Sequence, residues 1–94
     1  LWEQGEPGPD HTSGTWLKDK NIVAIGADNV GVESKPRGPL SLHAVALRDL
    51  GIYLLENINL DDLVRDKVHE FLFVGAPIRL IGGTGASMTP LALT

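Results

Sequence analysis

The segment SLHAVALRDLGIYLLE, residues 41–56, joins a helical pattern to a strand pattern through a single glycine. Side chains suited to one buried helix face recur up to that glycine, at Leu40, His43, Ala44, Leu47 and Leu50. This spacing predicts a helix over about 40–50, with Pro39 in its first turn and Gly51 as its C-terminal cap. The run that follows, 52–56, is short and apolar, which is typical of a buried strand.

A second strand pattern precedes this helix. Residues 22–25 form an apolar, β-branched run that stops at Gly26, as expected for a buried strand. A strand, a helix and a second strand in succession across 22–56 make a βαβ crossover, in which the two strands are parallel. The alternation of helical and strand patterns predicts the α/β class.

The remaining chain carries weaker patterns. Asp10 suits the N-cap of a helix that runs to about Lys20, and Asn59 suits the cap of a short helix over 60–66. A long strand pattern covers 69–81, with a bend at 75–77. A glycine-rich loop follows, and a last short strand is expected over 91–94.

Composition excludes several classes of protein. The 94 residues suffice for one small domain, and the net charge of −4 without a basic cluster gives no support for nucleic-acid binding. The absence of cysteine excludes disulfides and thiolate metal sites. No apolar run reaches the roughly 18 residues of a membrane span. The first residues contain neither an initiator methionine nor a signal-peptide pattern, so the sequence is interpreted as part of a longer chain.

His43 and Glu56 are predicted to meet although they lie on different elements. From His43 the helix rises about 10 Å to Leu50 at ~1.5 Å per residue, and from Ile52 the strand returns about 13 Å to Glu56 at ~3.3 Å per residue. The two lengths nearly cancel, which places both side chains at the carboxyl edge of the sheet, where α/β folds bind ligands. Asp28 follows the first strand and belongs to the same edge. Imidazole and carboxylate together suit Zn²⁺ or Mn²⁺.

Each of these three residues also has an ordinary structural explanation. A histidine in the first turn of a helix often caps the helix or lies at the surface. Glu56 can accept hydrogen bonds from the backbone N–H groups of 57–60, and Asp28 suits a turn. The geometry by itself therefore leaves the metal site and the structural roles open.

Three segments resemble, in order, the C-terminal part of the metal-dependent hydrolases of the cyclase family, which includes bacterial kynurenine formamidase, isatin hydrolase and a γ-lactamase. They are GEPGPDHTSGTWLKDKNIVAIGADNVGVE (5–33), LHAVALRDLGIYLLENINLDDL (42–63) and EFLFVGAPIRLIGGTGASMTPLAL (70–93). The details are closer to the isatin hydrolase and lactamase branch. The resemblance implies a β/β/α swivelling-type fold, of which residues 1–94 would form only the C-terminal half of a single domain.

The resemblance also implies roles for particular residues. His43 and Glu56 match the histidine and the glutamate that the family's C-terminal half contributes to a site for a divalent metal, Mn²⁺ or Zn²⁺. Asp28 would line the pocket or orient a ligand, and Gly83 and Thr84 would lie in a tight loop near the pocket. That loop, GGTGAS (82–87), lacks the Gly-Lys-Ser/Thr of a phosphate-binding loop.

The family's N-terminal motif, His-x-Gly-Thr-His-x-Asp-x-Pro-x-His, is absent from this sequence. The other metal ligands and the histidine expected as general base would therefore come from the N-terminal half of the same protein or from a companion chain. No catalytic residue is assigned within these 94 residues, and the chain alone is expected to be inactive. The two remaining histidines, His11 and His69, are interpreted as surface and structural.

The function implied is the metal-assisted hydrolysis of an amide C–N bond in a small cyclic or N-formyl substrate. By resemblance the protein would be cytoplasmic, bacterial and homo-oligomeric, with no nucleic-acid or membrane partner. Phe71, Phe73 and Val74 would belong to the core or to an oligomer interface. The alternative is a non-catalytic α/β module that associates with a partner chain or with itself through exposed apolar surface.

Overall fold

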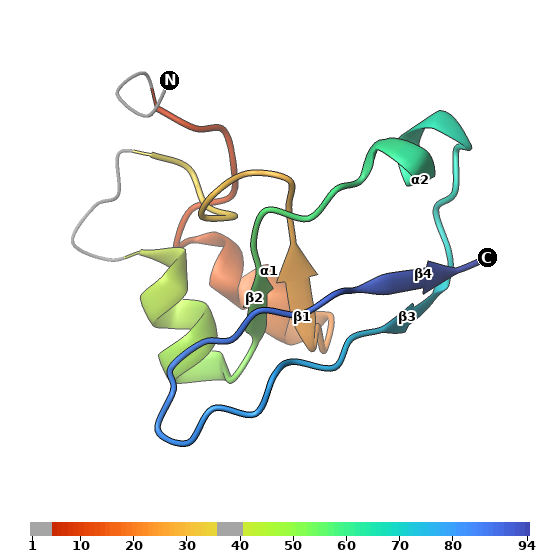
Figure 1. The fold of residues 1–94 in the computed structure, drawn as a ribbon. Coiled ribbons are helices and arrows are strands. Elements are labelled where there is room, and N and C mark those ends of the chain that lie inside the picture. Colours follow the sequence, from red (N-terminus) through yellow and green to blue (C-terminus); the bar gives the residue numbers. More distant parts are fainter. Residues whose placement is uncertain (1–4, 36–40) are drawn as a thin grey trace. The chain divides into compact units, whose positions relative to one another are not determined.

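The computed structural model describes residues 5–35 and 41–94, and Figure 1 shows the course of the chain. The chain divides into two compact units, Leu1–Asn59 and Leu60–Thr94, and each is described by itself. Helices and strands occur in both units, and each unit contains one two-stranded sheet. The predicted α/β class is thus confirmed as a small mixed α/β protein, and the swivelling-type fold stays a prediction.

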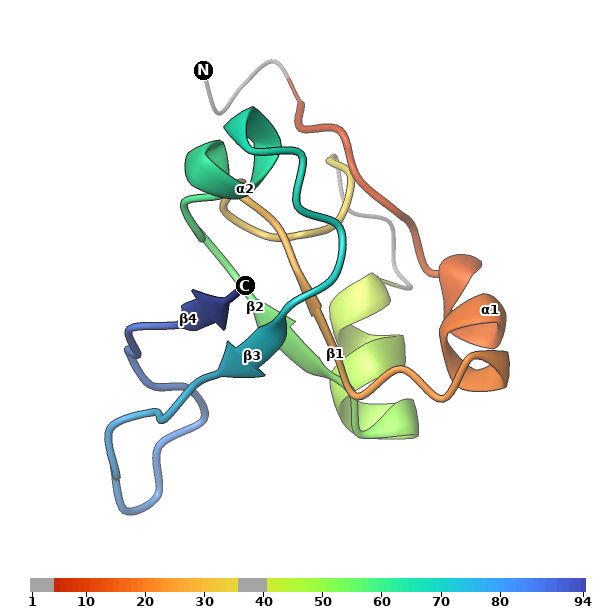
Figure 2. The same ribbon diagram turned by 90° about the vertical axis from the view of Figure 1, so that its right-hand side faces the viewer.

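The first unit contains α1 (Ser13–Asp19), β1 (Ala24–Gly26), η2 (Ala44–Leu50) and β2 (Tyr53–Leu55). β1 and β2 are parallel, with Ala24 opposite Tyr53 and Gly26 opposite Leu55, which confirms the predicted βαβ crossover. η2 contacts β2, and α1 packs against η2, so that η2 lies between α1 and the strands (Figure 2).

The core of this unit is small. Four buried residues, one from α1, two from the helical segment and one directly before β2, form a single cluster: Leu17, Leu42, Ala46 and Ile52. Half-buried apolar side chains surround it, namely Ile22, Ile25, Leu50 and Leu54. Both predicted strands and the predicted helix therefore contribute to one core, as the βαβ interpretation requires.

The helix before Gly51 differs from the expectation in form and in phase. Its last seven residues are a π-helix, in which hydrogen bonds join residues five apart rather than four. Leu42 and Ala46 are fully buried, whereas Leu47, which the predicted face included, is 50% exposed. The two buried positions, Leu42 and Ala46, are four residues apart, a spacing between the periods of an α-helix and a π-helix. A segment of about two turns is too short for its apolar pattern to distinguish these two periods. Pro39 and Leu40 lie outside the described residues.

The first helix begins later than predicted. Thr12, not Asp10, is the N-cap of α1, and Asp10 stands two residues before it. The Asp10 carboxylate accepts hydrogen bonds from the backbone N–H and the hydroxyl of Thr12, and these bonds hold the pKa of Asp10 below its ordinary value. Asp10 thus closes the turn that leads into the helix rather than capping the helix itself.

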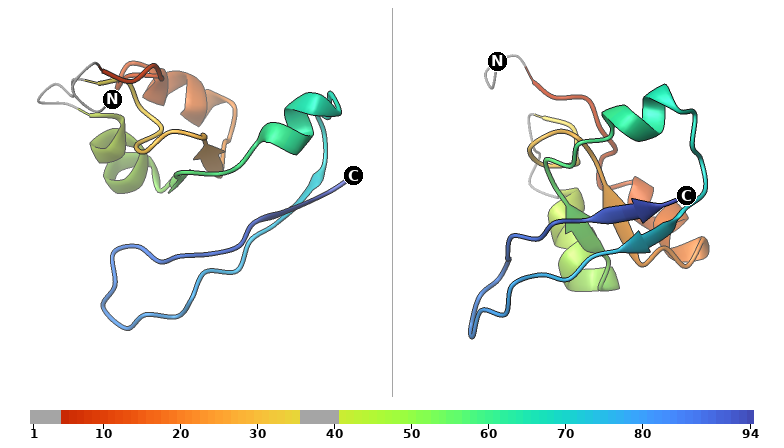
Figure 3. Two further views of the ribbon diagram at one scale, coloured as in Figure 1. Left: turned by 45° about the horizontal axis from the view of Figure 1, so that its top comes forward. Right: turned by 45° about the vertical axis from the view of Figure 1, so that its right-hand side comes forward.

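The second unit consists of α2 (Asp61–Arg65), β3 (Leu72–Val74) and β4 (Leu91–Leu93). β3 and β4 pair antiparallel, with Leu72 opposite Leu93, and Figure 3 shows them as two adjoining segments of a long hairpin. The predicted strand over 69–81 is therefore much shorter, although one further bond, from the Ile78 N–H to the Ser87 carbonyl at 3.1 Å, continues the hairpin beyond Gly75. The cap of α2 is Leu60 rather than Asn59.

Gly51 ends η2 as predicted, in the left-handed conformation at φ 68°. A Cβ added there meets no atom within 4 Å, so a substitution is opposed by backbone conformation alone. We expect Gly51→Ala to lower the free energy of unfolding of the first unit by about 1 kcal/mol. Urea denaturation followed by tryptophan fluorescence measures this. Gly51→Asn should lose less, since asparagine tolerates this conformation, and equal losses would contradict the explanation.

Candidate functional site

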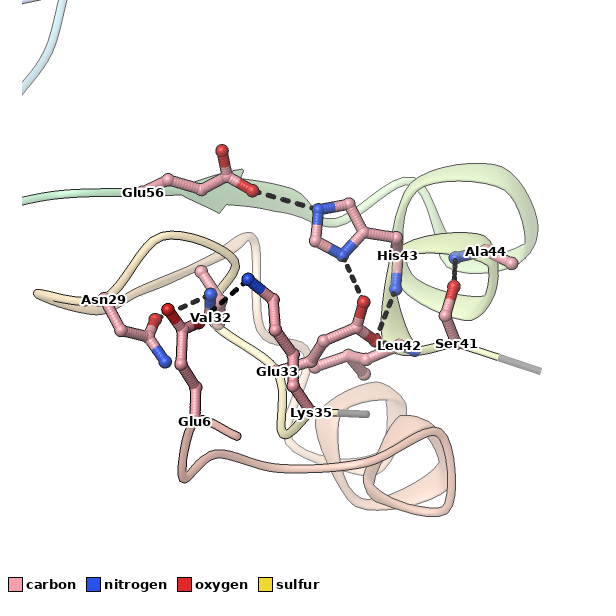
Figure 4. A network of polar contacts seen from close by, with 10 residues as sticks. All are labelled: Glu6, Asn29, Val32, Glu33, Lys35, Ser41, Leu42, His43, Ala44 and Glu56. Carbon is pink, nitrogen blue, oxygen red and sulfur yellow. Dashed lines mark hydrogen bonds and ion pairs between the residues drawn. The ribbon is translucent and has the colours of Figure 1, made fainter. Parts of the chain in front are cut away.

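His43 lies between two carboxylates, and each of its ring nitrogens faces one of them (Figure 4). Nδ1 is 2.8 Å from Oε1 of Glu33, and Nε2 is 3.0 Å from Oε1 of Glu56. The predicted meeting of His43 and Glu56 is thus confirmed, across a helix, a glycine and a strand. The counting of helix rise against strand rise placed the two side chains at one level, and the parallel sheet keeps them there.

The second carboxylate, Glu33, was not predicted. Its side chain is only 2% exposed, whereas those of His43 and Glu56 are 27% and 38% exposed. Its Oε2 accepts the backbone N–H of Leu42 and, at 3.4 Å, that of His43. The buried Glu33 carboxylate therefore contacts both the backbone at the start of the helical segment and the imidazole ring of His43.

The loop that carries Glu33 is held by contacts from distant parts of the chain. The Asn29 side chain accepts the Val32 N–H at 2.7 Å and donates to the Pro7 carbonyl at 3.0 Å. Glu6 and Lys35 form an ion pair at 3.2 Å. Val32 adopts φ 60°, a conformation that is costly for a β-branched residue. The segment before α1 thus helps to fix the conformation that directs Glu33 inward.

Gly8 lies against this loop so closely that a side chain does not fit. A Cβ at Gly8 would fall 2.7 Å from the carbonyl carbon of Glu33 and 2.8 Å from the nitrogen of Ser34, and neither backbone atom can move aside alone. We expect Gly8→Ala to lower the free energy of unfolding of the first unit by about 1–3 kcal/mol, as measured by urea denaturation. A free energy of unfolding equal to that of the wild type would contradict this close approach of Gly8 to the loop.

Asp28, the third residue predicted for this edge, takes no part in the His43 contacts. Its side chain is exposed, and the carboxylate that contacts the imidazole together with Glu56 belongs to Glu33, five residues later. Asp28 suited the end of the first strand, but the loop turns it to the surface. The local sequence carries no signal that Glu33, rather than Asp28, is the acidic side chain that becomes buried. Gly83 and Thr84 belong to the second unit, and their role beside a substrate stays a prediction.

The arrangement offers a divalent metal two ligands. Nε2 of His43 and Oε1 of Glu56 are 3.0 Å apart, which is closer than the roughly 3.3–3.6 Å between neighbouring atoms of a tetrahedral shell with bonds of about 2.0–2.2 Å. The partly exposed Glu56 side chain would therefore move by a few tenths of an ångström to share an ion with His43. Glu33 contacts the opposite ring nitrogen and cannot share that ion. Within 5–35 and 41–94, no three His, Cys, Asp or Glu side chains are grouped as a metal site. The residues present thus fit part of a site with a carboxylate behind its histidine.

Comparison of the chain with protein-family models, curated proteins and solved structures finds no match. The resemblance to the cyclase family therefore stays a prediction. Among the helices that the structure describes, none is long and apolar enough to cross a membrane.

Proposed function

We propose that this chain supplies part of the metal site of a hydrolase that cleaves amide C–N bonds in small cyclic or N-formyl substrates. The observation that carries the proposal is the approach of His43 Nε2 to Glu56 at 3.0 Å while Nδ1 is engaged by a buried carboxylate. A histidine that serves only as a helix cap needs neither contact. A metal-binding histidine ordinarily binds the metal through one ring nitrogen and donates the N–H of the other to an acceptor such as a carboxylate. Glu56 would be a second ligand beside Nε2, and Glu33 is the acceptor at Nδ1.

Zn²⁺ and Mn²⁺ both suit one imidazole and one carboxylate. A catalytic zinc ordinarily has three protein ligands, and His43 and Glu56 supply two. The proposal therefore assigns the missing ligand and the general base to residues outside those described here, in an N-terminal half of the protein or in a companion chain.

In this proposal the residues of this chain would bind the metal ion and orient its histidine ligand. His43 would present its Nε2 lone pair, and Glu56 would contribute an oxygen from the end of β2. When bound, the metal would polarise the substrate carbonyl and lower the pKa of a bound water. Glu33 would hold the imidazole ring in place from behind, with its own charge shielded from solvent by burial.

The test is native mass spectrometry of the protein isolated from its source with any associated chains, paired with a denatured run and an assay of cyclic-amide and N-formyl hydrolysis. We expect bound divalent metal, and hydrolysis that a chelator removes and Zn²⁺ or Mn²⁺ restores. An assembly without metal, or hydrolysis that is insensitive to chelation, would contradict the proposal.

A second candidate is a non-catalytic module that associates through the second unit. No residue of 60–94 is buried, and every residue of β3 and β4 is exposed. The large apolar side chains in this hairpin include Leu72, Phe73, Ile78 and Ile81. Isolated two-stranded hairpins are at best marginally stable in water, so this unit needs a covering surface. The same mass spectrum and hydrolysis assay separate the two candidates, because a metal-free assembly without hydrolytic activity is the result expected of a module.

A further inference from the structure

The two oxygens of Glu33 face different kinds of donor. Oε2 faces the backbone N–H groups of Leu42 and His43, whose hydrogens are fixed by the peptide planes. Oε1 faces Nδ1 of the His43 ring at 2.8 Å, where the presence of a hydrogen depends on the tautomer of the ring. Glu33 is 2% exposed, so solvent cannot readily replace either partner.

We propose that Glu33 is a positioning residue that fixes neutral His43 as the tautomer protonated at Nδ1 and thereby leaves the Nε2 lone pair available to a cation. The role in cation binding rests on the proposed metal site. The effect on the tautomer does not, because it follows from the contacts of the metal-free chain.

The argument compares the two places for one ring proton. With the proton on Nε2, the Nδ1 lone pair would face the Glu33 oxygen at 2.8 Å with no hydrogen between two acceptors, in a place closed to water. With the proton on Nδ1, the bare Nε2 faces Glu56, whose side chain is 38% exposed and can rotate away or be solvated. Leaving polar atoms unsatisfied costs more at the buried position, and the Nδ1 tautomer is therefore preferred.

Substitution of Glu33 by glutamine reverses this preference without changing the shape of the side chain. The amide has one oxygen and one NH₂ group, and its oxygen must face the backbone N–H of Leu42, which can only donate. The NH₂ group then faces Nδ1 of His43, which has to become an acceptor. The ring proton moves to Nε2, where it blocks the atom that a metal would use.

The first measurement is the long-range ¹H–¹⁵N spectrum of the metal-free protein with ¹⁵N-labelled histidine, at a pH where the ring is neutral. We expect a protonated Nδ1 for His43 in the wild type and a protonated Nε2 in Glu33→Gln. Glu6→Gln is the matched control, since Glu6 pairs with Lys35 on the same loop and does not touch His43. It should loosen the loop and keep the wild-type tautomer.

The second measurement is calorimetric titration of Zn²⁺ into the metal-stripped protein with any N-terminal half or companion chain present, because His43 and Glu56 supply only two ligands. We expect Glu33→Gln to bind Zn²⁺ about 10–100-fold more weakly than the wild type, as is typical when a carboxylate behind a metal-binding histidine is changed, and Glu6→Gln to bind within about twofold of it. A protonated Nε2 in the wild type overturns the proposal even if the variant fails to fold. So does an unchanged tautomer in a folded Glu33→Gln, or a changed tautomer with unchanged Zn²⁺ affinity. If the wild type shows the Nδ1 tautomer but binds no Zn²⁺, the proposed metal site fails, and the effect of Glu33 on the ring stands.

Discussion

Replacement of Leu17 by alanine is expected to destabilise the first unit by about 2–5 kcal/mol, the range for a leucine removed from a packed core. Leu17 is 2% exposed and is the residue through which α1 enters the four-residue core. Small domains have little stability in reserve, so a loss of this size leaves much of the unit unfolded at room temperature. Urea denaturation is followed by fluorescence, because both tryptophans, Trp2 and Trp16, precede Asn59.

Leu47→Ala is the matched control. Leu47 belongs to η2, which contacts both α1 and β2, but its side chain is 50% exposed. The sequence pattern had placed Leu47 on the buried face, and the structure places Leu42 and Ala46 there instead. A loss within about 0.5 kcal/mol is expected for an exposed position. If Leu47→Ala cost as much as Leu17→Ala, the helix would be phased as the sequence pattern predicted and the observed core would be wrong.

The sequence predicted those features that local chemistry decides. Gly51 is at a left-handed φ, which glycine adopts without a steric penalty, so the end of the helix and the start of β2 could be placed. The apolar runs on either side of the helix then required a parallel crossover. From that topology alone His43 and Glu56 had to lie at one level, and their side chains are 3.0 Å apart.

Glu33 could not be predicted in the same way, because its direction depends on residues far along the chain. Pro7 and Gly8 contact the loop at Asn29 and Val32, and these contacts stabilise a left-handed valine that no local preference favours. The residue types after β1 correctly predicted that Asp28 lies in a loop. They did not predict which acidic side chain of that loop is buried. Propensity likewise could not distinguish a π-helix from an α-helix over two turns.

The second unit shows a different limit. Its apolar runs were interpreted as a long strand, yet only Leu72–Val74 and Leu91–Leu93 pair. Period and composition show that a segment prefers an extended conformation. They do not show where regular pairing ends. Beyond β3 the two arms of the hairpin are joined by the bond from the Ile78 N–H to the Ser87 carbonyl, but neither arm is a strand there.

Replacement of His43 by alanine is expected to weaken Zn²⁺ binding by at least about 100-fold, a free-energy loss of about 2.7 kcal/mol. The substitution removes the only nitrogen ligand that the proposal assigns, and the Glu56 carboxylate alone is a weak and flexible ligand at a 38% exposed position. Calorimetric titration of Zn²⁺ into the metal-free protein measures this. His11→Ala and His69→Ala are matched controls, because both side chains are exposed and neither contacts Glu33 or Glu56.

The same variant should also lose stability, and this second effect tests the site without any metal. Without the ring, the 2.8 Å contact between Nδ1 and Oε1 of Glu33 is lost at a side chain that is 2% exposed, and a typical hydrogen bond contributes about 0.5–1.5 kcal/mol. If His43→Ala keeps both its Zn²⁺ affinity and its stability, His43 is a surface residue and the proposed site is refuted. If stability falls while Zn²⁺ affinity is unchanged, the contacts between Glu33 and His43 hold the fold together, and the metal binds elsewhere.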